Sequence, residues 1–284
     1  MILLAGLALG SSVVMTRLGI GEIPPLAFIT LRLGLAALIF LVALVVLQRE
    51  IPHHPRIWLD IALVGIGNTG LGLVAFTLAL QFISSGVLTI FLALIPLFTG
   101  LLAHFWLAQE KLNWVKLAGL VLAFFGVMLL LATRTTGLPD TESAVDLRGQ
   151  LLALGGVVVS AVAIVYTRRR LQNTDVFVLT AGQMIAGLLF VLPLAFSFNT
   201  LQLSGISWRG WLAVAYNGIV GSFIGFLLLF EMIKRFGATV AALPGYVVPF
   251  VSILLGTMLL REIFTLHLGA GALLILLGVF WASR

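Results

Sequence analysis

Long apolar runs separated by short polar segments make up most of this chain. A helix that crosses a lipid bilayer needs about 20 mostly apolar residues, and runs of that kind recur from one end of the sequence to the other. They are continuous rather than alternating, so they predict helices and not the strands of an outer-membrane barrel. We expect ten membrane-spanning helices, at about residues 2–20, 25–47, 57–80, 86–108, 113–132, 149–167, 176–197, 210–230, 239–260 and 264–282.

The second half of the chain echoes the first. The stretch EKLNWVKLAGLVLAFFGV (110–127) returns as EIFTLHLGAGALLILLGV (262–279), with the glutamate and the glycines at matching positions. Each half holds five predicted helices, and because five is odd, the second half enters the membrane from the opposite side. We therefore predict an all-α integral membrane protein built as two inverted five-helix repeats. The predicted units are residues 1–132, a polar connecting loop at 133–148, and residues 149–284.

Composition narrows the class. The chain is 61% hydrophobic and 9% charged, whereas a soluble domain carries about 25% charged residues. It has no cysteine, which excludes disulfides and thiolate metal sites. The first run lacks a basic n-region and a clear cleavage site, so we interpret it as the first span and not as a signal peptide.

Charge indicates orientation. The net charge is +6, but the basic residues lie at helix ends, which is typical of topology signals and not of nucleic-acid binding. With the N-terminus in the cytoplasm, ten basic residues fall on the cytoplasmic side and five on the other. The positive-inside rule then predicts a multi-pass protein of the cell (inner) membrane with both termini in the cytoplasm.

Two stretches carry a resemblance to a known family. LGSSVVMTRLGIGEIPPLAFITLRLGLAALIF (9–40) combines a small Gly-Ser pair, a basic residue, a double-proline turn and Arg32 in the second helix. FTLALQFISSGVLTIFLALIPLFTGLLAHFWLAQE (76–110) combines small residues, a helix-breaking proline and a glutamate. The chain resembles the EamA-type family of the drug/metabolite transporter superfamily over nearly its whole length.

The resemblance implies secondary transport, because relatives in this family export amino acids and other metabolites or drugs. The chain departs from the family pattern at three places. Leu9 stands where an aromatic residue is usual, Arg17 where lysine is common, and Gln183 in the second-half place of Arg32. The resemblance therefore does not carry over a substrate.

The inverted repeat itself favours a transporter. Two similar halves can exchange conformations around a midplane cavity between them, which gives alternating access. We expect an exporter of small metabolites, such as amino acids or drug-like amphipathic compounds, with no cofactor, no metal and no nucleic-acid partner. A non-transporting scaffold or subunit is the alternative. An intramembrane enzyme is a further one, but the sequence lacks the reactive constellations it needs. Whether two copies form a homodimer is left open.

Polar side chains inside apolar helices are the candidate pathway residues, because in a bilayer they must find partners. Arg32 could snorkel to the interface, or pair with Glu22, with helix carbonyls or with a substrate carboxylate. Asn68 and Asn217 fall near the middle of the third and eighth predicted helices. The predicted pathway set is Ser11, Ser12, Arg32, Asn68, Ser160, Gln183, Tyr216, Asn217 and Tyr246.

Two titratable residues are candidates for proton coupling, His104 and Glu231. A hydrogen-bonded structural histidine and a surface pair of Glu231 with Lys234 are the alternatives. Three prolines, at 96, 244 and 249, remove amide donors and predict helix breaks or hinges.

Glycines and glutamates have structural interpretations. GIGNTG (65–70) fits a nucleotide-binding pattern, but inside an apolar helix it predicts close helix packing instead. The glycines of the repeated stretch, at 119, 126, 271 and 278, are predicted packing faces. Glu110 and Glu262 are interpreted as markers of the turns that precede the fifth and tenth helices.

Overall fold

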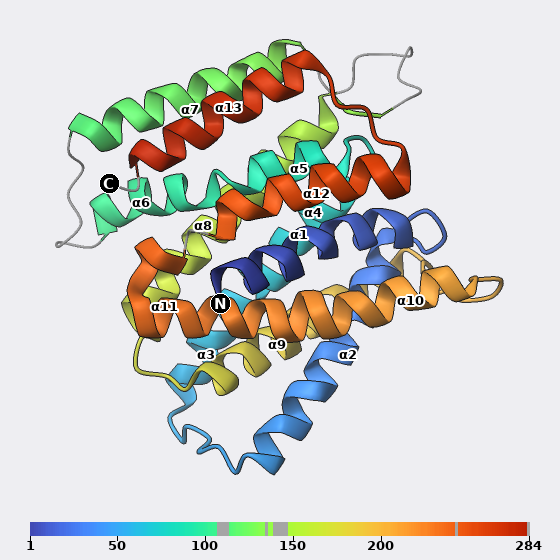
Figure 1. Cartoon of the computed structure of the whole chain (residues 1–284). Helices are drawn as coiled ribbons and strands as arrows, with labels where there is room; N and C mark the ends of the chain where they lie inside the picture. The colour runs from blue at the N-terminus through green and yellow to red at the C-terminus, as the bar shows by residue number, and fades with distance from the viewer. Residues whose placement is uncertain (107–113, 134–135, 139–146, 242–243, 283–284) are drawn as a thin grey trace.

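The computed structural model describes residues 1–284 apart from 107–113, 134–135, 139–146, 242–243 and 283–284. All regular elements of the described residues are helical (Figure 1). The first half contains α1 (Ile2–Gly19), α2 (Pro25–Val46), α3 (Pro55–Val64), η1 (Gly65–Gly72), α4 (Leu73–Ala79), α5 (Ser85–Leu92), α6 (Ile95–Trp106) and α7 (Trp114–Ala132). The second half contains α8 (Arg148–Arg170), α9 (Val176–Ser197), α10 (Trp208–Tyr216), η2 (Asn217–Gly225), α11 (Phe226–Ala241), α12 (Pro244–Leu260) and α13 (Leu266–Ala282).

Seven helical stretches of the described residues are long and apolar enough to cross a membrane. Three further apolar helices are shorter, at Leu117–Ala132, Val247–Leu260 and Leu266–Gly278. Large apolar side chains also cover the outside, where Trp114 is 85% and Leu266 is 86% exposed. The all-helical membrane class is thus confirmed, whereas ten crossings and an inverted orientation of the halves stay predictions.

Local sequence explains where several helices start. Proline occupies the first position of α2 and α3, where the missing N–H would have no helical partner. Side chains cap others: Ser84 accepts a hydrogen bond from Val87 N (3.1 Å), and Asp175 accepts one from Phe177 N (2.9 Å). Such caps satisfy amides that the first turn of a helix leaves free.

The same helix ending occurs in both halves. α2 and α9 are each followed by a residue with positive φ, Gln48 (47°) and Asn199 (52°). The next residue then donates its N–H back across the last turn, from Arg49 N to Leu44 O and from Thr200 N to Ala195 O. This is the Schellman pattern in which a left-handed residue closes a helix. Its recurrence shows that equivalent segments of the two halves fold alike.

A second recurring element is the π-helix. η1 and η2 each interrupt a longer helix, α3–α4 in the first half and α10–α11 in the second. Each packs against the first two helices of the opposite half, so η1 contacts α8 and α9, while η2 contacts α1 and α2. π-helical turns are rare and occur often at functional sites.

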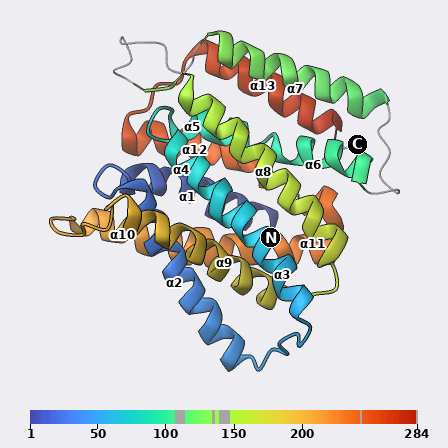
Figure 2. The same cartoon turned by 180° about the vertical axis from the view of Figure 1, so that it is seen from behind.

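The stretches that repeat in sequence lie next to each other in space. α7 and α13 run side by side along one edge of the molecule, while α2 lies at the opposite edge (Figures 1 and 2). A Cβ added at Gly126 would stand 2.9 Å from Gly271 O, and one at Gly278 would stand 2.5 Å from Gly119 O. The predicted glycine faces therefore let these two helices approach closely.

Candidate functional site

Polar side chains gather around η2 in a group that we call the η2 cluster, with five buried members (Ser12, Thr16, Arg32, Asn217 and Ser222) and two half-buried ones (Ser11 and Tyr216). Asn217 is fully buried at its centre. Its Oδ1 accepts hydrogen bonds from Ser12 Oγ (2.6 Å) and Thr16 Oγ1 (3.0 Å), and its Nδ2 donates to Ala213 O (3.1 Å). The hydroxyls of Ser11 and Tyr216 lie 2.7 Å apart beside it. The amide thereby ties α1 of the first half to η2 of the second.

Arg32 belongs to the same cluster. It is only 6% exposed, so it does not snorkel to the interface. Its Nε donates to Ser222 Oγ (2.7 Å). Within the described residues it forms no ion pair, and Glu22 accepts instead from Ser207 N (2.9 Å) and Ser207 Oγ (2.8 Å). Two alternatives that the sequence left open, snorkelling and a pair with Glu22, are therefore wrong.

A corresponding group, the η1 cluster, lies around η1 and comprises Asn68, Thr69, Ser160 and Gln183. Thr69 Oγ1 donates to Gln183 O (2.7 Å), whereas Asn68 Nδ2 reaches Gln183 Oε1 only at 3.4 Å. Gln183 Nε2 and Ser160 Oγ are buried and have no hydrogen-bond partner among the described residues. A Cβ added at Gly72 would stand 2.8 Å from Ser160 Oγ, so that hydroxyl faces η1.

The structure thus distributes the predicted pathway residues over two clusters. Ser11, Ser12, Arg32, Tyr216 and Asn217 lie in the η2 cluster, and Asn68, Ser160 and Gln183 lie in the η1 cluster. The ninth, Tyr246, belongs to α12, but its side chain lies outside what the structure describes.

Sequence reasoning missed three members of these clusters, Thr16, Thr69 and Ser222. Thr16 follows Ser12 by four residues, the spacing that places two side chains on one helix face, and this signal was available. Ser222 follows Asn217 by five residues, the spacing of the hydrogen bonds in a π-helix and not in an α-helix. The sequence pattern carried no signal for that wider turn.

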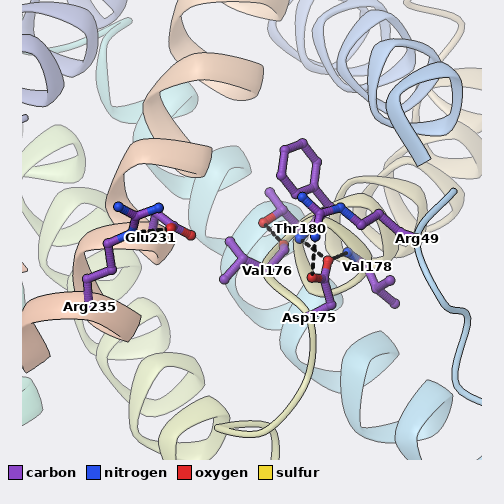
Figure 3. A network of polar contacts seen from close by, with 8 residues as sticks. Arg49, Asp175, Val176, Val178, Thr180, Glu231 and Arg235 are labelled. Atoms are coloured by element: carbon purple, nitrogen blue, oxygen red, sulfur yellow. Dashed lines mark hydrogen bonds and ion pairs between the residues drawn. The ribbon is translucent and has the colours of Figure 1, made fainter. Parts of the chain in front are cut away.

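The two candidates for proton coupling lie outside both clusters. Glu231 on α11 bonds Arg235 one turn further on, and Figure 3 shows the two side chains together. The described geometry thus shows Arg235 as a partner, while the side chain of Lys234 lies outside the described set. The His104 ring packs edge-on against Phe105 with 5.2 Å between centroids. Asp60 was not among the predicted site residues, and it is a buried carboxylate in the structure. It is 8% exposed and accepts a hydrogen bond from Tyr166 OH (2.7 Å).

The three prolines take different places. α5 ends at Leu92 and α6 starts at Ile95, so Pro96 follows directly on an interruption between two helices. Pro244 is the first residue of α12. Pro249 lies inside α12, which is one helix from end to end, so it does not divide that helix.

A buried carboxylate joins the two halves at one end of the molecule. Glu262, 8% exposed, precedes α13 and accepts hydrogen bonds from Ser85 N (2.8 Å), Ser85 Oγ (2.7 Å) and Gly86 N (3.3 Å). These amides open α5 of the first half, where a negative charge is favourable. Glu262 was interpreted as a turn marker, and the structure adds that it caps a helix of the other half. Glu110 lies outside the described residues.

The segment that follows the C-terminal end of α2 also contacts the second half. Arg49 lies 3.5 Å from Asp175, the residue that caps α9, and its guanidinium stands 4.9 Å from the centroid of the Phe177 ring. Figure 3 shows Asp175 between Arg49 and the first turn of α9. Both charged side chains are partly exposed, so we expect this pair to contribute little to stability.

Comparison with known families gives a consistent match. The family model described as the EamA-like transporter family matches residues 1–132 and 147–284. A Bacillus subtilis relative described as the uncharacterized transporter YoaV is 25% identical over 95% of this chain and 91% of its own length. An Archaeoglobus fulgidus relative, an uncharacterized transporter, is 27% identical over 92% of this chain and 89% of its own.

Two further comparisons concern location and fold. The Escherichia coli (strain K12) uncharacterized inner membrane transporter YedA is 29% identical over 87% of this chain and 78% of its own length. A solved structure, described only as the crystal structure of a protein, superposes with a TM-score of 0.71 over 99% of this chain and 94% of that chain. At 21% identity that likeness supports the fold alone.

Proposed function

This chain belongs to the EamA-like transporter family, and we propose that it is a secondary transporter that exports small metabolites by alternating access between two inverted five-helix repeats. The family and the names of the relatives indicate a multi-pass membrane transporter and not an enzyme. The substrate class, the direction of transport and the mechanism are our proposal.

The observation that carries the proposal is the crossed placement of the two π-helices. Each lies at the same place in its half and contacts the first two helices of the other half. The polar residues of both clusters therefore lie at contacts between the halves, where a rearrangement of one half against the other would change them. A scaffold has no need of paired polar groups in the bilayer at such contacts, because each is costly to bury there.

We propose that the pathway is closed at the end of the molecule where Glu262 caps α5. With the N-terminus in the cytoplasm, as the basic residues favour, this end faces outward. Ser84 N also donates to Thr136 O (2.7 Å), and Ile263 N donates to Gly137 O (2.9 Å). These bonds hold the segment after α7 between the start of α5 and the residues that precede α13. In an exporter cycle these contacts would separate when the substrate leaves.

Counterflow in proteoliposomes tests the proposal. Vesicles with the purified full chain are loaded with a panel of unlabelled metabolites and tested for uptake of the labelled compound, with and without a pH gradient. We expect at least one small metabolite to accumulate transiently in these vesicles and not in protein-free vesicles. A broad panel with no counterflow under either condition would contradict a transporter and favour the scaffold.

A further inference from the structure

Arg32 is a buried charge with no carboxylate partner among the residues that the structure describes. Its relative exposure is 6%, and within the described residues its polar partner is the neutral hydroxyl of Ser222. A buried charge is normally paired with an opposite charge, because removal from water is costly. In the described part of the chain this arginine thus lacks the opposite charge that usually accompanies a buried guanidinium.

The free part of the guanidinium is not sealed off. Nε is bonded to Ser222, so the two Nη groups carry the donors that remain. Unlike Ser160 Oγ and Gln183 Nε2, these Nη groups are not among the enclosed polar atoms that lack a partner in the described part of the chain. Within the described residues they have no protein partner, and the 6% exposure of Arg32 shows that the side chain is not completely enclosed, which leaves room for a ligand.

The surroundings restrict the charge of such a ligand. Arg32 Nη2 and Ser12 Oγ lie against the same residue, since a Cβ added at Gly221 would stand 3.3 Å from the first and 2.2 Å from the second. The η2 cluster otherwise contains hydroxyls and one amide, so it offers one positive charge. A single carboxylate balances that charge, whereas a phosphate monoester, with roughly −1.5 to −2 charges, would leave an excess buried.

Resting on the transport function proposed above, we propose that the η2 cluster is an anion subsite in which Arg32 binds the carboxylate of a small amphipathic monocarboxylate. The planar guanidinium presents its Nη donors to both carboxylate oxygens. Ser222 positions the arginine through Nε, and Ser12 lies beside the bound group. The equivalent place of the η1 cluster holds the neutral Gln183. The negative charge of the ligand is therefore recognised by Arg32 alone, at one of the two clusters.

Binding by matched pairs of probes tests this subsite. The full chain in lipid nanodiscs is heated with 3-phenylpropionate or 4-methylpentanoate, each against its uncharged primary amide, and with inorganic phosphate. A bound ligand raises the apparent melting midpoint. We expect at least one carboxylate to raise it, while its amide and phosphate do not. No rise with any carboxylate, an equal rise with the amide, or a rise with phosphate alone would overturn the subsite.

Variants assign the effect to the guanidinium. Arg32→Gln, which introduces the residue found in the other half, should weaken the carboxylate by roughly 10- to 100-fold, the usual effect of losing a charged hydrogen bond. Arg32→Lys keeps the charge but loses the planar fork, so its affinity should fall in between. Arg49→Gln is the matched control, since Arg49 follows the same helix and is 41% exposed in its side chain. It should bind as the wild type does.

Two further readouts keep the result decisive. If Arg32→Gln does not fold, Ser222→Ala removes only the bond that positions Nε, and it should still lower carboxylate affinity; unchanged affinity would contradict the subsite. Counterflow separates the two proposals. Transport of the neutral amides at the rate of the acids overturns the subsite and leaves the transporter standing, whereas no transport of any compound overturns the transporter.

Discussion

The η1 and η2 clusters occupy the same place in the two halves but differ in how well their polar groups are satisfied. Around η2, Asn217 has three hydrogen bonds of 3.1 Å or less and Arg32 has one of 2.7 Å. Around η1, the Asn68 amide reaches its partner only at 3.4 Å, and two polar atoms have no partner among the described residues. The two halves thus share the π-helix and its packing against the other half, while the polar side chains around it differ in charge and in hydrogen bonding.

The largest effect is expected from giving the η1 cluster a charge. Gln183 is fully buried against η1, so Gln183→Arg would place an unpaired cation there at a cost of several kcal/mol. We expect the variant to yield little folded protein by size-exclusion chromatography. Gln183→Leu is the control: it removes an unpaired buried donor and should fold near normally. An arginine variant as stable as the wild type would show that the two clusters are electrostatically alike.

A smaller difference is expected between the two asparagines. Asn217→Ala removes the acceptor of two hydroxyls and should lower the free energy of unfolding by about 2 kcal/mol. Asn68→Ala removes one long hydrogen bond and should lower it by less than about 0.5 kcal/mol. Denaturant titration in micelles measures both. Equal losses would mean that η1 is held as firmly as η2.

The smallest difference between the clusters is expected for the two serines. Ser160→Ala deletes a buried hydroxyl that has no partner in the part of the protein that the structure describes, so stability should stay the same or rise slightly. Ser12→Ala deletes a donor to Asn217 and should lower stability by about 1 kcal/mol. Both midpoints can be followed by intrinsic fluorescence on heating. A clear loss at Ser160 would reveal a partner for that hydroxyl, such as a bound water.

Much of this architecture could be predicted from the sequence, because apolar runs and repeated glycines are local signals. The α7–α13 pairing follows from the echo between 110–127 and 262–279, since matching small-residue faces allow close contact. The candidate pathway residues could be selected from the sequence because polar groups inside apolar helices are conspicuous, and their role in transport stays a prediction.

The remaining features depend on backbone geometry or on distant contacts. The π-helix η2 brings Ser222 toward the same face as Asn217, and no residue pattern in the sequence predicts a π-helix there. The partner of Glu262 lies 177 residues away in sequence, so its role as a cap of α5 could not be inferred from its own turn. Arg32 was found, but its lack of a carboxylate partner required the positions of Glu22 and Ser222.

The central claim is that the halves separate where Glu262 caps α5, and a reversible cross-link tests it most directly. The chain has no cysteine, and a Cβ added at Gly86 on α5 would lie 3.8 Å from Ile253 Cβ on α12. That distance suits a disulfide, for which Cβ atoms are about 3.8 Å apart.

The double variant Gly86→Cys/Ile253→Cys is assayed by counterflow with the compound that the wild type transports, and the two single variants serve as controls. We predict that oxidation stops counterflow and that reduction restores it, while the single variants do not respond. Continued counterflow by protein that mass spectrometry shows to be fully cross-linked would contradict the account.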